Sequence, residues 1–249
     1  MIQYIRSFIF NAFFFVWMAL ISIGCFIGGI FGGYKGVNRV GEACSWGVEQ
    51  LLRFIIGTTT EFRGQENIPK GGKFFVACKH QSAWETVSLH RFVKDPTVVM
   101  KRELIYLPVF GTVVQQAGSI IIDRKKGKAV LPQMIEGAKR SFEKNRPVLI
   151  FPEGTRSAPG KPGRYRHGIF ALYKALNAPI LPIALNAGYF WPRRGFLKKK
   201  GKLILEYLPP IQPGLNEKEF MATLERVIEE ASLRIAPSQP HSLNKKATP

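Results

Sequence analysis

An uncharged stretch near the N-terminus constrains this chain more than any other feature. Phe8 to Phe31 holds no charged residue, and Asn11 and Ser22 are its strongly polar side chains. About 20 apolar residues suffice to cross a bilayer as a helix. A cleaved signal peptide fits less well, because the apolar core is longer than is typical and no small-x-small cleavage site precedes Tyr34. We therefore predict an uncleaved membrane segment.

Composition alone does not decide whether this segment crosses the membrane or turns back within it. Glycines crowd its second half, with GxxxG spacings typical of packed helices: Gly24, Gly28, Gly29, Gly32 and Gly33. So many glycines also favour a bend, and a single membrane helix and a re-entrant helical hairpin fit equally well. Residues 42–56 predict an amphipathic helix that could lie in the membrane interface. Residues 1–57 are the predicted membrane anchor.

The charge balance of the chain is strongly basic. Its 249 residues include 36 Lys and Arg against 17 Asp and Glu, a net charge of +19. Such an excess indicates a polyanionic partner, which would be nucleic acid, an anionic membrane surface or phosphorylated substrates. The apolar stretch favours the membrane over nucleic acid. Three cysteines without metal or disulfide spacing fit reduced, structural thiols in a cytosol-facing protein: Cys25, Cys44 and Cys78.

Beyond residue 57 the pattern becomes an alternation of short strands and helices. Strands are expected at 73–77, 97–100, 119–122, 148–151, 180–185 and 202–208, and helices at 84–92, 104–116 (with a loop), 127–144, 167–176 and 217–235. Alternation of this kind predicts an α/β domain over residues 58–235, with a mostly parallel sheet flanked by helices. Residues 236–249 are rich in Pro, Ser and Lys and predict a disordered tail.

The first candidate motif is His80-Gln81-Ser82-Ala83-Trp84-Glu85, directly after a predicted strand. Glu85 falls in the first turn of the next predicted helix, where the helix dipole favours a carboxylate. Such a carboxylate can hold one imidazole nitrogen and raise the basicity of the other, as in a hydrolase triad without its serine. The simpler interpretation of this motif alone is a solvated histidine near an unrelated acid. The five-residue steps to Glu85 and His90 do not suit zinc.

The second candidate motif is Phe151-Pro152-Glu153-Gly154-Thr155-Arg156-Ser157, which follows the strand at 148–151. Gly154 allows close backbone approach, Arg156 offers bidentate donors to a phosphate, and Glu153 could bind an acceptor hydroxyl. A surface Glu–Arg pair in a turn is the alternative. The absence of a Walker-type glycine loop leaves nucleotide hydrolysis without support. Parallel sheets bind ligands at the carboxyl ends of their strands, so both motifs predict one shared site.

In combination, the two motifs resemble the 1-acyl-glycerol-3-phosphate acyltransferase (lysophosphatidic acid acyltransferase) family of glycerolipid acyltransferases, which is marked by H-x4-D and F-P-E-G-T-R motifs. Three further blocks agree with that family: Lys101-Arg102-Glu103-Leu104 with Pro108 and Gly111, Gly118 to Arg124, and Ile180 to Ala184. The resemblance covers roughly residues 62–208 and the N-terminal membrane segment. It departs at Glu85, where the family usually has Asp.

The resemblance implies a role for each matching residue. His80 would be the general base, Glu85 would orient it, and Lys101 would lie near the thioester. The substrate-binding residues would be Arg124, Glu153, Gly154, Thr155 and Arg156. The implied reaction moves a fatty acyl group from acyl-CoA or acyl-carrier protein to the 2-hydroxyl of 1-acyl-glycerol-3-phosphate, forming phosphatidate. It needs no cofactor or metal. The implied location is the cytoplasmic (inner) membrane, with the catalytic domain facing the cytoplasm.

Two alternative functions fit part of the same sequence. A related enzyme would acylate another lyso-lipid, such as lyso-ornithine lipid or a lysophospholipid, but a phosphate acceptor suits Arg124 and Arg156. A non-catalytic basic membrane or nucleic-acid binder would explain the charge but not the ordered motifs, so no nucleic-acid partner is expected. The basic stretch around Trp191 to Lys202 fits either docking to an anionic surface or a solvated loop.

Overall fold

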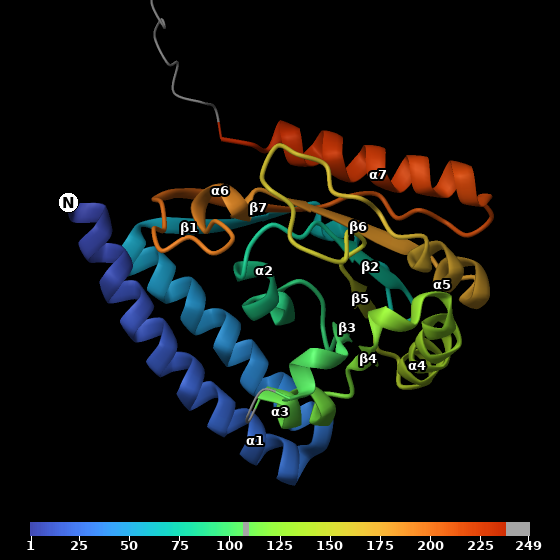
Figure 1. Ribbon diagram of the computed structural model, residues 1–249, viewed down its shortest axis with the longest axis horizontal. Coiled ribbons are helices and arrows are strands. Elements are labelled where there is room, and N and C mark those ends of the chain that lie inside the picture. The colour runs from blue at the N-terminus through green and yellow to red at the C-terminus, as the bar shows by residue number, and fades with distance from the viewer. Residues whose placement is uncertain (107–109, 238–249) are drawn as a thin grey trace, which may run out of the picture.

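The computed structural model describes residues 1–106 and 110–237, apart from the side chains of Lys126 and Lys128 (Figure 1). A seven-stranded sheet of order β1-β7-β6-β2-β5-β3-β4 forms its centre. The strands are β1 (Thr58–Arg63), β2 (Phe75–Cys78), β3 (Thr97–Lys101), β4 (Ile120–Ile122), β5 (Val148–Ile150), β6 (Ile180–Leu185) and β7 (Gly201–Tyr207). Every neighbouring pair is parallel except β6 and β7. The predicted α/β fold with a mostly parallel sheet is confirmed.

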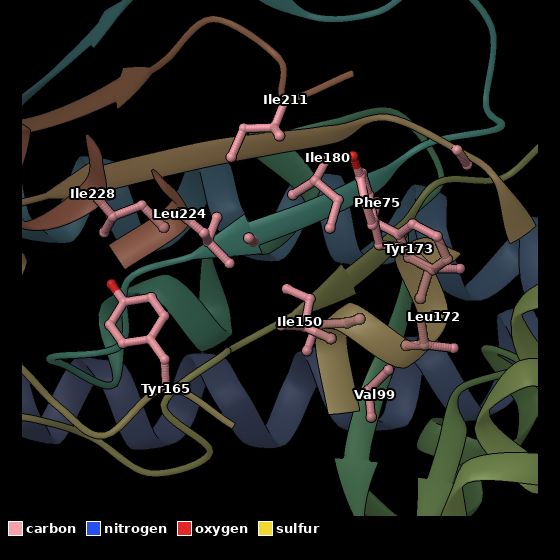
Figure 2. Close-up of a cluster of buried hydrophobic side chains, with 14 of the residues drawn as sticks. Phe75, Val99, Ile150, Tyr165, Leu172, Tyr173, Ile180, Ile211, Leu224 and Ile228 are labelled. Carbon is pink, nitrogen blue, oxygen red and sulfur yellow. The ribbon is translucent and has the colours of Figure 1, made fainter. Parts of the chain in front are cut away.

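Alternate residues of each central strand point to opposite faces of the sheet. Phe75 and Ala77 belong to a core shared with α4 (Leu131–Glu143), α5 (Gly168–Leu176) and α7 (Glu217–Arg234), part of which Figure 2 shows. Phe74 and Val76 belong to a second core shared with α1 (Ile2–Leu51), α2 (Trp84–Val87) and α6 (Ala187–Phe190). The sheet is therefore buried on both faces, which explains why its central strands are apolar throughout.

The N-terminal segment forms a helical hairpin rather than one straight helix. α1 is interrupted at Gly33, whose φ of 54° and ψ of −142° turn the chain back on itself (Figure 1). The two arms pack closely, since Trp17 Nε1 donates to the carbonyl of Cys44 at 3.3 Å and Gly28 faces Gly36 without room for a side chain. Of the two predicted geometries, the structure has the hairpin. A short π-helical turn (Leu52–Ile56) leads from it to β1.

The two arms of the hairpin have different surroundings. The first arm is long and apolar enough to cross a membrane by length and composition, and it leaves a row of large side chains exposed. They include Ile9, Val16, Leu20, Ile23, Ile27 and Ile30. The second arm packs on the α/β domain, where Ser45 Oγ donates to the carbonyl of Val87 at 3.2 Å. This arrangement is compatible with membrane association of the first arm.

Several element boundaries differ from the sequence-based expectation. β1 was not predicted, because Thr58–Arg63 is a polar edge strand that pairs with β7 alone. The helix expected at 84–92 is split into α2 and a 3-10 turn (Leu89–Arg91), and α4 begins at Leu131 because Pro132 stands in its first turn. The remaining elements are α3 (Phe110–Gln116) and 3-10 turns at Gln65–Asn67, Arg102–Tyr106 and Arg124–Val130. Pro108 and residues 238–249 of the predicted tail lie outside the described residues.

Candidate active site

His80 and Glu85 are paired at the carboxyl end of β2. The Nδ1 atom of His80 lies 2.9 Å from Oε1 of Glu85, and the His80 ring stacks on Phe151 with centroids 4.1 Å apart. The side chain of His80 is 14% exposed, whereas that of Glu85 is fully buried. Because Nδ1 faces the carboxylate, Nε2 is the nitrogen left to meet a substrate. The arrangement suits a base whose tautomer is fixed by a buried acid.

The length of Glu85 is matched to the turn that precedes α2. Its Oε1 also accepts from the backbone N–H groups of Gln81 and Ser82, at 2.5 Å each. The extra methylene relative to Asp therefore lets one oxygen reach back to the imidazole and to two N–H groups of the turn before α2. These three donors fix the position of the carboxylate.

Glu153 is bound by protein groups rather than directed at a ligand. Its Oε2 accepts from the backbone N–H of His80 at 2.8 Å, and its Oε1 lies 2.8 Å from Lys79 Nζ. Glu153 is 2% exposed, and the backbone of Gly163 covers it so closely that a Cβ there would lie 2.5 Å from Oε1. The structure thus argues against the expected contact between Glu153 and an acceptor hydroxyl, because the carboxylate is buried, with Oε2 on the His80 N–H and Oε1 facing the Lys79 ammonium.

The loop that carries the second motif closes onto the first motif. The backbone N–H of Ser157 donates to the carbonyl of His80 at 2.8 Å, and the Ser157 hydroxyl donates to the same oxygen at 3.3 Å. At its far end, the N–H of Arg166 donates to the carbonyl of Pro152 at 2.9 Å. These contacts bring Arg156 and His80 to the same edge of the sheet, as the sequence predicted for the two motifs.

A cavity of about 1090 Å³ opens beside this edge. Its walls are mainly apolar side chains of β3, β4, β5, α4 and α5, including Val99, Ile122, Leu131, Met134 and Ile169. Phe151, the ring that stacks on His80, also lines it. A volume of this size is at the upper end of ordinary ligand sites, and a mostly apolar lining suits a hydrocarbon chain.

Two arginines stand at the polar part of the cavity wall. Arg124 donates from Nη1 to the carbonyl of Gly154, and Arg166 lies nearby. Partial desolvation lowers the pKa of the Arg124 guanidinium, and the charge of Arg166 lowers it further. Two neighbouring guanidinium groups repel each other, so an anion between them would be stabilising. Sequence reasoning named Arg124 but missed Arg166, which is ten residues beyond Arg156 in a basic run.

The other predicted residues lie at the same end of the sheet. Lys101 is the exposed last residue of β3, and Thr155 is exposed at the tip of the second motif. Arg156 is half-buried, and its carbonyl accepts from Arg193 Nη1 at 3.0 Å. Among residues 1–106 and 110–237, no three or more His, Cys, Asp or Glu side chains are grouped to hold a metal ion.

Comparisons with known proteins agree with this geometry. A family model described as Acyltransferase matches residues 59–186. The chain is 37% identical over 193 residues to the 1-acyl-sn-glycerol-3-phosphate acyltransferase of Pseudomonas aeruginosa, covering 76% of this chain and 75% of that protein. It is 28% identical over 179 residues to the 1-acyl-sn-glycerol-3-phosphate acyltransferase alpha of Ovis aries, covering 71% of this chain and 62% of that protein.

A solved structure has the same fold. The crystal structure of the 1-acyl-sn-glycerophosphate (LPA) acyltransferase PlsC from Thermotoga maritima matches with a TM-score of 0.77 and 22% identity, covering 95% of this chain and 100% of that one. That likeness extends over the N-terminal hairpin as well as the sheet, since little of either chain is left out. With the family match and the Pseudomonas relative, it follows that this chain belongs to the acyltransferase family.

Proposed function

We propose that this acyltransferase moves a fatty acyl group from acyl-CoA or acyl-carrier protein to the 2-hydroxyl of 1-acyl-glycerol-3-phosphate, forming phosphatidate. The observation that carries the proposal is the His80–Glu85 pair, whose imidazole stacks on Phe151 in the wall of an apolar cavity that Arg124 and Arg166 also line. One site thus combines a base, space for hydrocarbon and an anion clamp. The Pseudomonas aeruginosa and Ovis aries relatives carry the name of this activity.

In the proposed reaction, Nε2 of His80 removes the proton from the acceptor 2-hydroxyl. The oxygen then attacks the thioester carbonyl and forms a tetrahedral intermediate. When the C–S bond breaks, the thiolate takes the proton from His80, and the new ester is released. The buried Glu85 carboxylate stabilises the imidazolium formed in between. Base catalysis contributes about 10²–10⁴-fold, and holding the hydroxyl against the thioester contributes further.

The proposed oxyanion partner is Lys101. It is the exposed last residue of β3, at the carboxyl end of that strand and two places from β2 in the sheet. A cation near the carbonyl oxygen would stabilise the charge that develops in the intermediate.

The proposed phosphate site consists of Arg124, Arg156 and Arg166, with the backbone of Gly154 and the hydroxyl of Thr155 beside them. Arg124 and Arg166 line the cavity together with Phe151, the ring stacked on His80, so a phosphate held there would keep the glycerol on the side of His80. Glu153 is omitted from the ligand set, because its oxygens bind Lys79 and the His80 N–H. A fatty acyl chain would occupy the apolar part of the cavity.

We also propose a location at the cytoplasmic face of the inner membrane, with residues 1–57 as the anchor and 58–235 as the catalytic domain. The hairpin would lie in one leaflet, because its second arm packs along the domain and carries Lys35, Arg39 and Glu42. The strong positive charge favours an anionic membrane surface and a cytoplasmic domain. The loop after α6 supports this orientation, since Phe196 is exposed and stacks on Tyr4 of the first arm.

An acyl-transfer assay with the full-length protein in lipid micelles tests the proposal. 1-Acyl-glycerol-3-phosphate, a lyso-ornithine lipid and a neutral-headgroup lysophospholipid would be compared, each with acyl-CoA and with acyl-carrier protein as donors. We expect the highest kcat/KM with 1-acyl-glycerol-3-phosphate and loss of product in His80→Ala. A higher kcat/KM with a lyso-lipid that lacks the phosphomonoester would contradict the proposed acceptor.

A further inference from the structure

The residue directly before His80 is a buried lysine. Lys79 is 1% exposed, although lysine is rarely enclosed unless its charge is paired. It stands at the end of β2, between the core strand and the catalytic histidine. No role is assigned to it by either motif, so its burial needs a separate explanation.

Two carboxylates share the charge of Lys79. Its Nζ lies 2.8 Å from Oε1 of Glu153 and 2.5 Å from Oε1 of Glu229. Glu229 belongs to α7, 150 residues further along the chain, and its Oε1 also accepts from the hydroxyl of Tyr165 at 3.0 Å. Tyr165 belongs to the same buried core as Leu224 and Ile228 of α7 (Figure 2). The network therefore joins β2, the loop after β5 and the C-terminal helix.

This network is connected directly to His80. While Oε1 of Glu153 faces Lys79, its Oε2 accepts the backbone N–H of His80 at 2.8 Å. The position of Glu153 is thus set by Lys79, and the position of Lys79 is set by Glu229. If Glu153 shifts, the His80 backbone loses its N–H partner and the imidazole moves relative to the site.

We propose that Lys79 and Glu229 are positioning residues for acyl transfer, which hold His80 in place through Glu153. The inference rests on the proposed function for its reaction, but not for its geometry. It makes α7 a necessary part of the active site, although α7 carries no residue of either motif. A reaction that depends on near-attack geometry is sensitive to such a shift, since a misplacement of about 1 Å can cost about 100-fold in rate.

The charges of the network give a test that a merely structural role would fail. Lys79→Met leaves the buried carboxylate of Glu153 and the partly buried carboxylate of Glu229 without their shared cation. Adding Glu229→Gln removes one of these charges, so the double variant has a single carboxylate to accommodate. We expect the double variant to turn over faster than Lys79→Met alone. If the two substitutions instead damaged independent structural contacts, their free-energy costs would add, and the double variant would be slower than Lys79→Met alone.

The experiment measures kcat, both substrate KM values and the thermal midpoint of the full-length protein. Glu229→Gln keeps the side-chain shape and an acceptor for Tyr165, so we expect it to fold and to lower kcat about tenfold with both KM values unchanged. Lys79→Met should lower kcat about 100-fold. Glu230→Gln, an exposed change on the same helix, should keep the wild-type kcat. Wild-type kcat in Glu229→Gln, or a loss carried by KM alone, would overturn the proposal.

A chemical readout separates this proposal from the proposed function. Diethyl pyrocarbonate modifies neutral imidazole, and mass spectrometry can compare His80, 14% exposed at its side chain, with His167, 69% exposed. We expect Glu229→Gln to raise the modification rate of His80 severalfold relative to His167. An unchanged ratio would overturn the positioning role. Absence of transfer to every lyso-lipid by the wild type would overturn the proposed function and leave this comparison valid.

Discussion

Glu85 Oε1 accepts from three donors at once, namely His80 Nδ1 at 2.9 Å and the backbone N–H groups of Gln81 and Ser82. One carboxylate oxygen therefore fixes both the imidazole and the turn from which it projects. The two backbone hydrogen bonds hold the carboxylate independently of the imidazole. The position of the pair therefore does not depend on side-chain contact alone.

The first prediction concerns this pair. We expect His80→Ala to lower kcat at least about 100-fold with the fold intact, because the hydroxyl loses its base. Glu85→Gln should cost a similar factor, since an amide does not stabilise the imidazolium. Glu85→Asp should keep part of the activity. Initial rates and circular dichroism check this, and Glu136→Gln, an exposed change on α4, is the matched control. Wild-type turnover in His80→Ala would exclude the mechanism.

The second prediction concerns the arginines at the cavity. We expect Arg124→Ala and Arg156→Ala to raise the acceptor KM, because a hydrogen bond to a charged group such as phosphate is worth about 1.5–3 kcal/mol. Steady-state kinetics with each substrate varied in turn measures this. Arg140→Ala, which removes an exposed arginine of α4, should leave both KM values unchanged. A rise in the donor KM alone would mean that these residues bind the donor.

The fold and the position of the site could largely be predicted from the sequence. The central strands read as apolar runs because both of their faces are buried, and the two motifs follow β2 and β5, which are neighbours in the sheet. The polar strand β1 lacks this signal, because it is at the sheet edge and pairs with β7 alone. The pairing of His80 with Glu85 is local in sequence and was therefore open to prediction.

The contacts that join distant parts of the chain could not be predicted. The Lys79–Glu229 pair spans 150 residues, and nothing in the local sequence of α7 marks Glu229 among its other acids. The structural role of Glu153 depends on the same network. The choice of hairpin over span depends on packing as well, since Gly41 leaves room for the His90 ring and Gly47 for Trp17.

The third prediction concerns the close approach of the hairpin arms. A Cβ at Gly36 would overlap the Gly28 carbonyl, whereas one at Gly32 would meet nothing within 4 Å. We expect Gly36→Ala to reduce the free energy of unfolding by about 1–3 kcal/mol, the usual cost of overpacking. Gly32→Ala, the matched control, should be neutral or slightly stabilising. Thermal unfolding in detergent measures both, and equal midpoints would contradict the packed hairpin.

The fourth prediction concerns membrane attachment. Leu20 and Ile27 are 58% and 48% exposed on the first arm. Each apolar side chain buried in lipid is worth about 1.5–3 kcal/mol, so Leu20→Glu with Ile27→Glu should move much of the protein from the membrane pellet to the supernatant. The control variant, with Ala222→Glu and Leu233→Glu at exposed positions of α7, should stay in the pellet.

High salt should not release the wild-type protein from the membrane, because salt screens surface charge and barely affects buried apolar area. Release by salt alone would exclude an apolar anchor.

The last prediction concerns the contact between the hairpin and the domain at low pH. Burial lowers the pKa of His90 from 6.5 to about 4, the Arg146 charge acts in the same direction, and Asp95 opposes them. The unfolded chain therefore binds a proton below about pH 6.5 that the folded protein accepts only near pH 4, so the free energy of unfolding falls as pH drops through this window. The full effect is on the order of 3 kcal/mol. We expect His90→Gln to lose stability less steeply than the wild type between pH 6.5 and 4, because it lacks this titration. Unfolding midpoints of the two proteins along a pH series measure this. If the difference between their midpoints stayed constant from pH 6.5 to 4, His90 would not be held neutral against Gly41.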